Sequence, residues 1–175
     1  MVALADWARS QELRLVGSAA DLPDFAPLKS FNTRVRTAIA GRAITLAQIQ
    51  TSNAGLTSAV ASPRTWNIIL RNLPSSWPTT ALRPTSHEVS VVDLFSLSSY
   101  PSLMPSQRFM IFGQEAHAAK SLAESTIPAL LPADIALVLD GNHLILDFTA
   151  RPFDEIEFER LIRLSDQLIP RLVAG

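Results

Sequence analysis

"IALVLDGNHLILDF", residues 135–148, is the stretch that decides the fold of this chain. Two apolar runs lie on either side of the four residues Asp140, Gly141, Asn142 and His143. Glycine and asparagine readily take the positive φ angles that a tight turn needs. The stretch therefore predicts a β-hairpin, and with it an antiparallel sheet.

Two registers are possible for this hairpin. If Gly141-Asn142 is the two-residue loop, Asp147 lies opposite Ala136. If the loop is one residue earlier, Asp147 lies opposite Asp134. Like charges that face each other across a ladder are unfavourable, which favours the first register.

The polar residues of the hairpin also raise the question of a metal or acid–base site. His143 and Asp147 share one strand and are about 13 Å apart at roughly 3.3 Å per residue. Zinc needs its nitrogen and oxygen ligands at about 2.0–2.2 Å, so these two residues cannot share an ion. Asp140 and His143 at a corner do not make a site by themselves. We predict a turn that faces water, with no metal ligands.

The chain has 175 residues, of which 47% are apolar and 18% are charged. This length and composition predict a single domain, residues 1–175. The absence of cysteine excludes disulfides, thiolate metal sites and cysteine nucleophiles. The start of the chain lacks the pattern of a signal peptide, and no apolar run reaches 18 residues. We expect a cytoplasmic location.

The remaining elements follow from periodicity and from Gly and Pro signals. Helices are predicted at 3–11, at 114–131 with an end near Pro128, and at 154–172 with Asp154 as N-cap and Glu157 as its capping-box partner. Strands are predicted at 13–16, 35–52 with a break at Gly41, 64–73, 107–113, and 79–85 as an edge strand ending at Pro84. Residues 74–106 read as an irregular Pro/Ser-rich segment, within which 87–97 has strand-like content.

These elements predict an α+β fold. We expect an antiparallel sheet of about five to seven strands, with two main helices packed on one face and a short N-terminal helix.

Charge is distributed unevenly along the chain. Residues 1–85 carry a net charge of +5 and residues 86–175 a net charge of −6. The simplest interpretation is that the two halves interleave in one fold. An alternative is binding of an anionic surface through Lys29, Arg34, Arg36 and Arg42. Because Arg34 and Arg36 alternate with a valine, the wet face of a half-buried strand explains them more simply, and a nucleic-acid partner is not favoured.

Enzyme motifs are absent from the sequence. It contains no G-x-S-x-G, no H-E-x-x-H and no glycine-rich phosphate loop, so we assign no catalytic, cofactor or metal residue. His117 reads as a solvated helix residue. The alternative is a small hydrolase-like enzyme with a site assembled around His87, Glu88 and Asp93, together with Arg108.

The leading hypothesis is a non-catalytic interaction or scaffold module with a protein partner. It depends on Trp77 and Tyr100 in the Pro/Ser-rich segment. Trp77, between a serine and a proline, is expected to be exposed, as a partner site requires. With Arg34 and Arg36, these two aromatic residues form the predicted partner surface.

The order of the pieces resembles a widespread bacterial family of uncharacterised proteins. The matching pieces are "LADWARSQELRLVG", "VRTAIAGRAITLAQIQ", "TTALRPT", "QRFMIFGQEAHAAKSLAESTIPALL", "VLDGNHLILDF" and "EIEFERLIRLSDQLIPRL". "FSLSSYPSLMPS" departs from the pattern, because such proteins usually have a short acidic link there. The resemblance implies a fold and no catalytic residues. Some of these proteins look like cytoplasmic domains attached to membrane helices.

Overall fold

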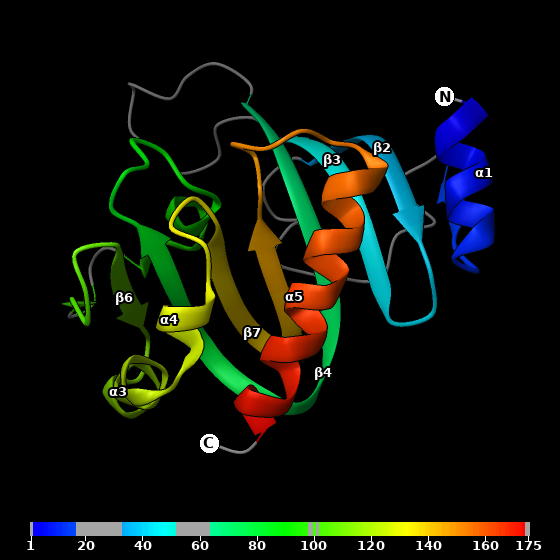
Figure 1. Cartoon of the computed structure of the whole chain (residues 1–175). Helices are drawn as coiled ribbons and strands as arrows, with labels where there is room; N and C mark the ends of the chain where they lie inside the picture. Colours follow the sequence, from blue (N-terminus) through cyan, green and yellow to red (C-terminus); the bar gives the residue numbers. More distant parts are fainter. Residues whose placement is uncertain (1, 17–32, 52–63, 98–99, 101, 174–175) are drawn as a thin grey trace.

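A computed structural model describes residues 2–16, 33–51, 64–97, 100 and 102–173. An open, seven-stranded antiparallel sheet forms the centre of the molecule, which confirms the predicted α+β class (Figure 1). Its strands are β1 (Arg14–Val16), β2 (Arg34–Ala40), β3 (Ile44–Thr51), β4 (Arg64–Pro84), β5 (Ser102–Leu103), β6 (Phe109–Gly113) and β7 (Ala136–Asp147). The strand order is β1-β2-β3-β4-β6-β5, and β7 pairs with β4. The helices are α1 (Val2–Ser10), the 3-10 helix η3 (Val91–Phe95), α3 (Ala116–Glu124), α4 (Ile127–Leu130) and α5 (Glu155–Val173).

The predicted turn at 140–143 is present as a sharp bend in the middle of β7. The residues just outside the two ends of this strand, Asp134 and Arg151, form an ion pair of 2.9 Å. A straight strand would hold them more than about 40 Å apart at roughly 3.3 Å per residue, so the chain must reverse. Gly141 takes the positive φ of 57° that the bend requires.

β4 bends around the outside of β7, and the two strands stay paired on both sides of the bend (Figure 1). The outer path is longer: β4 advances from Asn72 to Trp77 while β7 moves only from His143 to Gly141. The predicted strands 64–73 and 79–85 are thus the two arms of one element.

Two predictions for this region are wrong. The second arm of β4 is not an edge strand, because it pairs with β6 on one side and β7 on the other. Trp77 is half-buried, since the bend of β4 places it opposite Gly141 and packs it against the core. The polar neighbours of Trp77 in the sequence predicted an exposed side chain, but the position of the bend in the folded sheet determines its burial.

The sheet separates two apolar clusters. The larger one lies between the sheet and the helices α1, α3, α4 and α5, and includes Phe109, Phe148 and Phe158. The smaller one lies on the opposite face and is covered by η3 through Val91, Val92 and Leu94. The main helices therefore pack on one face, as predicted. The strand-like content of 87–97 was misleading, because this segment forms η3.

The helical predictions hold with two corrections. Residues 114–131 form two helices instead of one, and Pro128 lies in the first turn of α4, where its missing N–H costs little. α5 begins as predicted, with Asp154 accepting a hydrogen bond of 2.9 Å from the backbone N–H of Glu157. The Glu157 side chain does not close the capping box, because it pairs with Arg151 at 2.6 Å.

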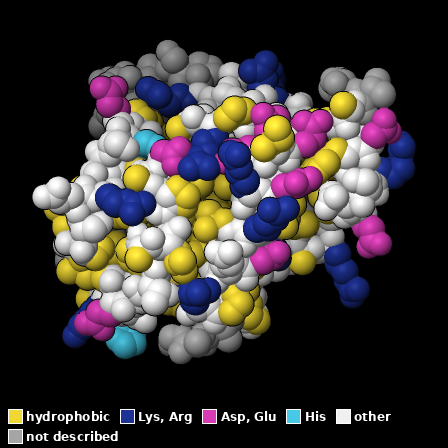
Figure 2. Space-filling view, viewed as in Figure 1, with side chains coloured by type: hydrophobic (Ala, Val, Ile, Leu, Met, Phe, Trp, Pro, Cys, Tyr) yellow, Lys and Arg dark blue, Asp and Glu magenta, His cyan; other side chains and the backbone are white. Residues whose placement is uncertain are grey.

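Opposite charges from the two halves of the chain meet in the fold. Arg71 of β4 pairs with Asp166 of α5 at 2.8 Å, and Arg83 pairs with Asp93 at 2.9 Å. Figure 2 shows positive and negative side chains interspersed over α5. The predicted interleaving of the two halves is therefore confirmed at these two pairs. Within the described ranges, no helix has both the length and the apolar content needed to cross a bilayer.

Candidate functional site

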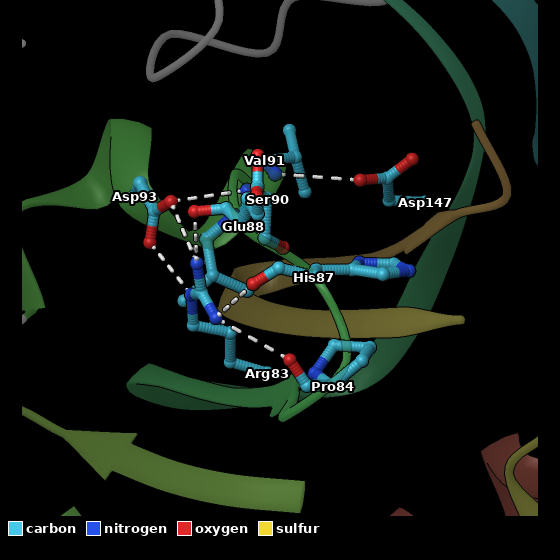
Figure 3. Close-up of polar contacts among 9 residues, drawn as sticks. Arg83, Pro84, His87, Glu88, Ser90, Val91, Asp93 and Asp147 are labelled. Carbon is cyan, nitrogen blue, oxygen red and sulfur yellow. Dashed lines mark hydrogen bonds and ion pairs between the residues drawn. The ribbon is translucent and has the colours of Figure 1, made fainter. Parts of the chain in front are cut away.

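The loop between Pro84 and η3 is organised by one side chain, Arg83. Its Nε and Nη2 donate to the two carboxylate oxygens of Asp93 at 2.9 and 3.2 Å. The remaining N–H groups donate to the backbone carbonyls of Pro84 at 3.3 Å, His87 at 2.8 Å and Glu88 at 3.0 Å (Figure 3). A guanidinium has five N–H donors, so all of them are used. Arg83 therefore fixes the path of the whole loop from the inside.

The loop passes directly into η3 through a reciprocal cap. The Ser90 hydroxyl accepts a hydrogen bond from the backbone N–H of Val92, and the Asp93 carboxylate accepts one of 3.0 Å from the backbone N–H of Ser90. Asp93 thus serves both the guanidinium and the helix start. This carboxylate is committed to the structure of the loop.

Asp147 holds the other side of the same loop. The residue is 1% exposed, and its carboxylate accepts hydrogen bonds from the backbone N–H groups of Val91 at 3.3 Å and Thr149 at 2.9 Å, and from the Thr149 hydroxyl. Burial raises the pKa of Asp147, and the hydrogen bonds and the charge of His87 only partly oppose this effect. The prediction that this polar residue lies at a wet corner is wrong.

A second ion network is centred on Arg151, four residues after Asp147. Arg151 donates to both oxygens of Asp134 at 2.9 Å and to Glu157 at 2.6 Å. The hydrogen bonds from Arg151 lower the pKa of Asp134, and these two acids raise the pKa of Arg151. Glu157 also accepts from Arg160 at 3.2 Å. The network connects the hairpin to α5.

A cavity of about 590 Å³ opens beside the loop. Its polar lining consists of Arg64, Thr65, Ser86, His87, Glu88 and Thr149. Trp66, Val89 and Ala150 supply apolar lining. Figure 3 shows the imidazole of His87 pointing away from the Arg83 guanidinium, on the side where Asp147 lies.

The structure does not assemble the predicted enzyme site. His87 and Glu88 line the cavity, but Asp93 turns to Arg83. Arg108 lies elsewhere: its Nη2 donates to the carbonyl of Leu131 at 2.8 Å, and its guanidinium lies over the ring of Phe109 at 5.5 Å. Within the described residues, no group of three His, Asp or Glu side chains is placed to hold a metal ion.

The predicted basic group is dispersed. Arg34 and Arg36 are exposed on β2, as expected for its wet face, and Arg42 is exposed in the turn after β2. Arg34 begins β2, and six residues of extended chain separate it by roughly 20 Å from Ala40, beyond which Arg42 lies, so the two are too far apart for one compact anion. Lys29 lies outside the described residues. His117 is exposed on α3, and Tyr100 is 39% exposed.

Sequence reasoning missed the two residues that organise the site, Arg83 and Arg151. The partners of Arg83 are mostly backbone carbonyls, which carry no sequence signal, and those of Arg151 lie 6 and 17 positions away in the chain. For Asp93 a signal was present, because Ser90 and Asp93 have the spacing of a capping box.

Comparison with protein-family models, with curated proteins and with solved structures found no match to the chain. The resemblance to a bacterial family stays a prediction.

We expect Asp147→Asn to gain stability relative to the native chain as the pH rises. Burial holds the pKa of Asp147 above its ordinary value of about 3.9, so the folded protein binds this proton more tightly than the unfolded chain does. The native chain therefore loses stability as the pH rises from that value through the raised pKa. The amide has no proton to lose. Urea unfolding of both proteins from pH 3 to pH 8 measures the difference.

The matched control is Asp6→Asn, which changes an exposed aspartate of α1. The assignment of a raised pKa would be contradicted if the stability of Asp147→Asn relative to the native chain stayed constant, or fell, as the pH rises over this range.

Proposed function

We propose that the protein is a non-catalytic interaction module that binds an extended apolar segment of a partner protein. The observation that carries this proposal is an apolar groove of about 660 Å³ between β5 and α3. Leu103, Met104 and Pro105 form one wall. The other wall is α3, on which Ala116, Ala119 and Ala123 are lining residues.

Exposed apolar side chains are concentrated at this end of the sheet. Five large hydrophobic residues are exposed in the described part of the chain, and three of them are Tyr100, Leu103 and Met104. Met104 is 62% exposed. A clustered apolar surface of this kind is typical of a binding site, and methionine adapts its shape to different partners. Leu103 and Met104 therefore replace Trp77 as the centre of the proposed partner surface, and Tyr100 remains part of it.

The alanines of α3 explain why a groove forms there. They follow one another at spacings of three and four residues, which places them on one side of the helix. Their small side chains leave a trough against Leu103 and Met104. A partner that fills the trough removes these two side chains from water, and a fully buried methionine or leucine contributes about 1.5–3 kcal/mol.

The position of β5 favours an extended partner. This strand is the last in the order of the described sheet. The outer backbone groups of an edge strand can pair with an added strand, which is a common mode of peptide recognition. The charges beside the groove, Lys120 and Glu124, lie 3.9 Å apart and offset each other. The groove therefore suits an uncharged segment with apolar residues at alternate positions.

The chemistry of the polar residues agrees with a binding role. Among the described residues, three groups have shifted pKa values: Asp134, Asp147 and Arg151. Each is held by hydrogen bonds within the fold, and none of them is a lining residue of the cavity at His87. An active site usually places such groups at the cavity wall.

Selection from a display library of seven-residue peptides tests the proposal. We expect enriched peptides with apolar residues at alternate positions, which shift the backbone amide NMR signals of β5 and α3. The double variant Leu103→Asp/Met104→Asp should weaken their binding at least about tenfold, because the groove loses its apolar wall and gains charge.

The matched control is Ile156→Asp, which changes an exposed apolar residue of α5, 66% exposed and outside the groove. It should bind the selected peptides as the native chain does. Failure to enrich any peptide, or equal binding by the double variant, would overturn the proposal.

A further inference from the structure

The cavity at His87 is a second feature, separate from the β5–α3 groove. Three parts of the chain surround it: the start of β4, the loop that Arg83 holds, and the residues that follow β7. Its volume of about 590 Å³ lies within the range of roughly 300–1,000 Å³ that is usual for small-molecule sites. The proposed protein-binding role makes no use of it.

The loop is fixed before any ligand arrives. Arg83 uses its N–H groups on three inward-facing carbonyls of the loop and on Asp93, while Asp147 holds the backbone N–H of Val91. The imidazole of His87 is consequently presented on the opposite side of the loop from Arg83 (Figure 3). A site held in this way loses little conformational entropy when it binds a ligand.

The lining indicates the charge of a ligand. The guanidinium of Arg64, the imidazole of His87 and the hydroxyls of Thr65 and Ser86 are all hydrogen-bond donors. The Thr149 hydroxyl is already committed to Asp147. This donor set matches the oxygens of a carboxylate, which an arginine binds in bidentate fashion.

The surrounding carboxylates favour a ligand with a single negative charge. Glu88 lines the cavity and offsets part of its positive charge. Asp134 and Asp147 both interact with the charge of His87, although Asp134 is paired with Arg151. A dianion would meet these groups at a greater electrostatic cost than a monoanion. Trp66, Val89 and Ala150 provide contact for an apolar body.

The geometry points to binding of a small organic monocarboxylate in this cavity, with its oxygens at Arg64 and His87 and its apolar body against Trp66. Arg83 is a positioning residue for this site, since it contacts the loop and not the cavity.

Benzoate and its neutral isostere benzamide are suitable probes. Titration followed by the imidazole NMR signals of His87 and by tryptophan fluorescence should show benzoate binding at least about tenfold more tightly than benzamide, as expected for charge-assisted hydrogen bonds. Arg64→Met and His87→Gln should each weaken benzoate binding while leaving the urea midpoint of unfolding unchanged.

Two control variants separate this site from others. Arg34→Met removes an exposed arginine of β2, and Met104→Asp alters the β5–α3 groove; both should bind benzoate as the native chain does. Equal affinity for benzoate and benzamide, or native affinity in both Arg64→Met and His87→Gln, would overturn the inference. The proposed peptide-binding role is tested at different residues, so one of the two proposals can be refuted without affecting the other.

Discussion

Replacing Arg83 with methionine is expected to lower the free energy of unfolding by about 2–4 kcal/mol. Methionine keeps most of the apolar stem but removes every hydrogen bond that the guanidinium makes to Asp93 and to the loop carbonyls. The Arg83 side chain is only 16% exposed, so water cannot fully replace it. Asp93 is 32% exposed and recovers part of its hydration, which keeps the expected loss below that of a fully buried pair. Chemical denaturation at pH 7 measures the change.

Two further variants test whether the lost hydrogen bonds of the guanidinium cause the loss of stability in Arg83→Met. Arg83→Lys keeps the charge but cannot reproduce the planar fork, so we expect it to recover less than half of the lost stability. Arg163→Met is the matched control, because Arg163 is 77% exposed and lies 3.9 Å from Glu159. Exposed pairs contribute little, and a change within about 0.5 kcal/mol is expected there. An Arg83→Met protein with the native unfolding midpoint would show that the loop does not depend on this side chain.

Arg151→Met is expected to cost about 3–5 kcal/mol, the largest effect of a single substitution considered for this chain. Its partner Glu157 has a side chain only 6% exposed, so removal of the guanidinium leaves a carboxylate buried at the start of α5, where the exposed Arg160 is its remaining ion-pair partner in the described part of the chain. Asp134, at 41% exposed, is better solvated and contributes less. Thermal and urea unfolding at pH 7 measure the loss.

A second substitution tests this explanation of the loss. In the Arg151→Met background, Glu157→Gln should restore part of the stability, because the buried charge is gone. Asp134 also makes the effect depend on pH. Because Arg151 lowers the pKa of Asp134 in the folded protein, the ion pair stabilises the native chain at pH values above the ordinary pKa of an aspartate. This stabilisation is lost as the pH falls through the lowered pKa. The difference between native and Arg151→Met proteins should therefore shrink in acid. A difference that grows would contradict the role of the Asp134 pair.

Local signals in the sequence predicted much of the fold. The hairpin at Gly141 and the start of α5 at Asp154 depend on residues within a few positions of one another, and both are present. The prediction that Trp77 is exposed was wrong because its environment depends on residues distant in the sequence. Its neighbours are polar, but its environment is set by Gly141, which is more than sixty positions away in the chain.

The candidate site was less accessible from the sequence. His87 and Glu88 were predicted together and line one cavity. The residues that hold their loop were not found, since the partners of Arg83 are mostly backbone carbonyls, which carry no sequence signal. The burial of Asp147 was missed because one of its hydrogen-bond donors, the backbone N–H of Val91, lies in a segment whose sequence is strand-like but which forms η3.

The nested bends of β4 and β7 also fix the alignment of the sheet. If β7 slid by one residue along β4, every side chain of its arms would change to the opposite face. Leucines of the helical side would face η3, Asp147 would leave Val91, and an L-amino acid would replace Gly141 at the left-handed position. The bends therefore exclude every neighbouring alignment, and this constraint acts in the middle of the sheet.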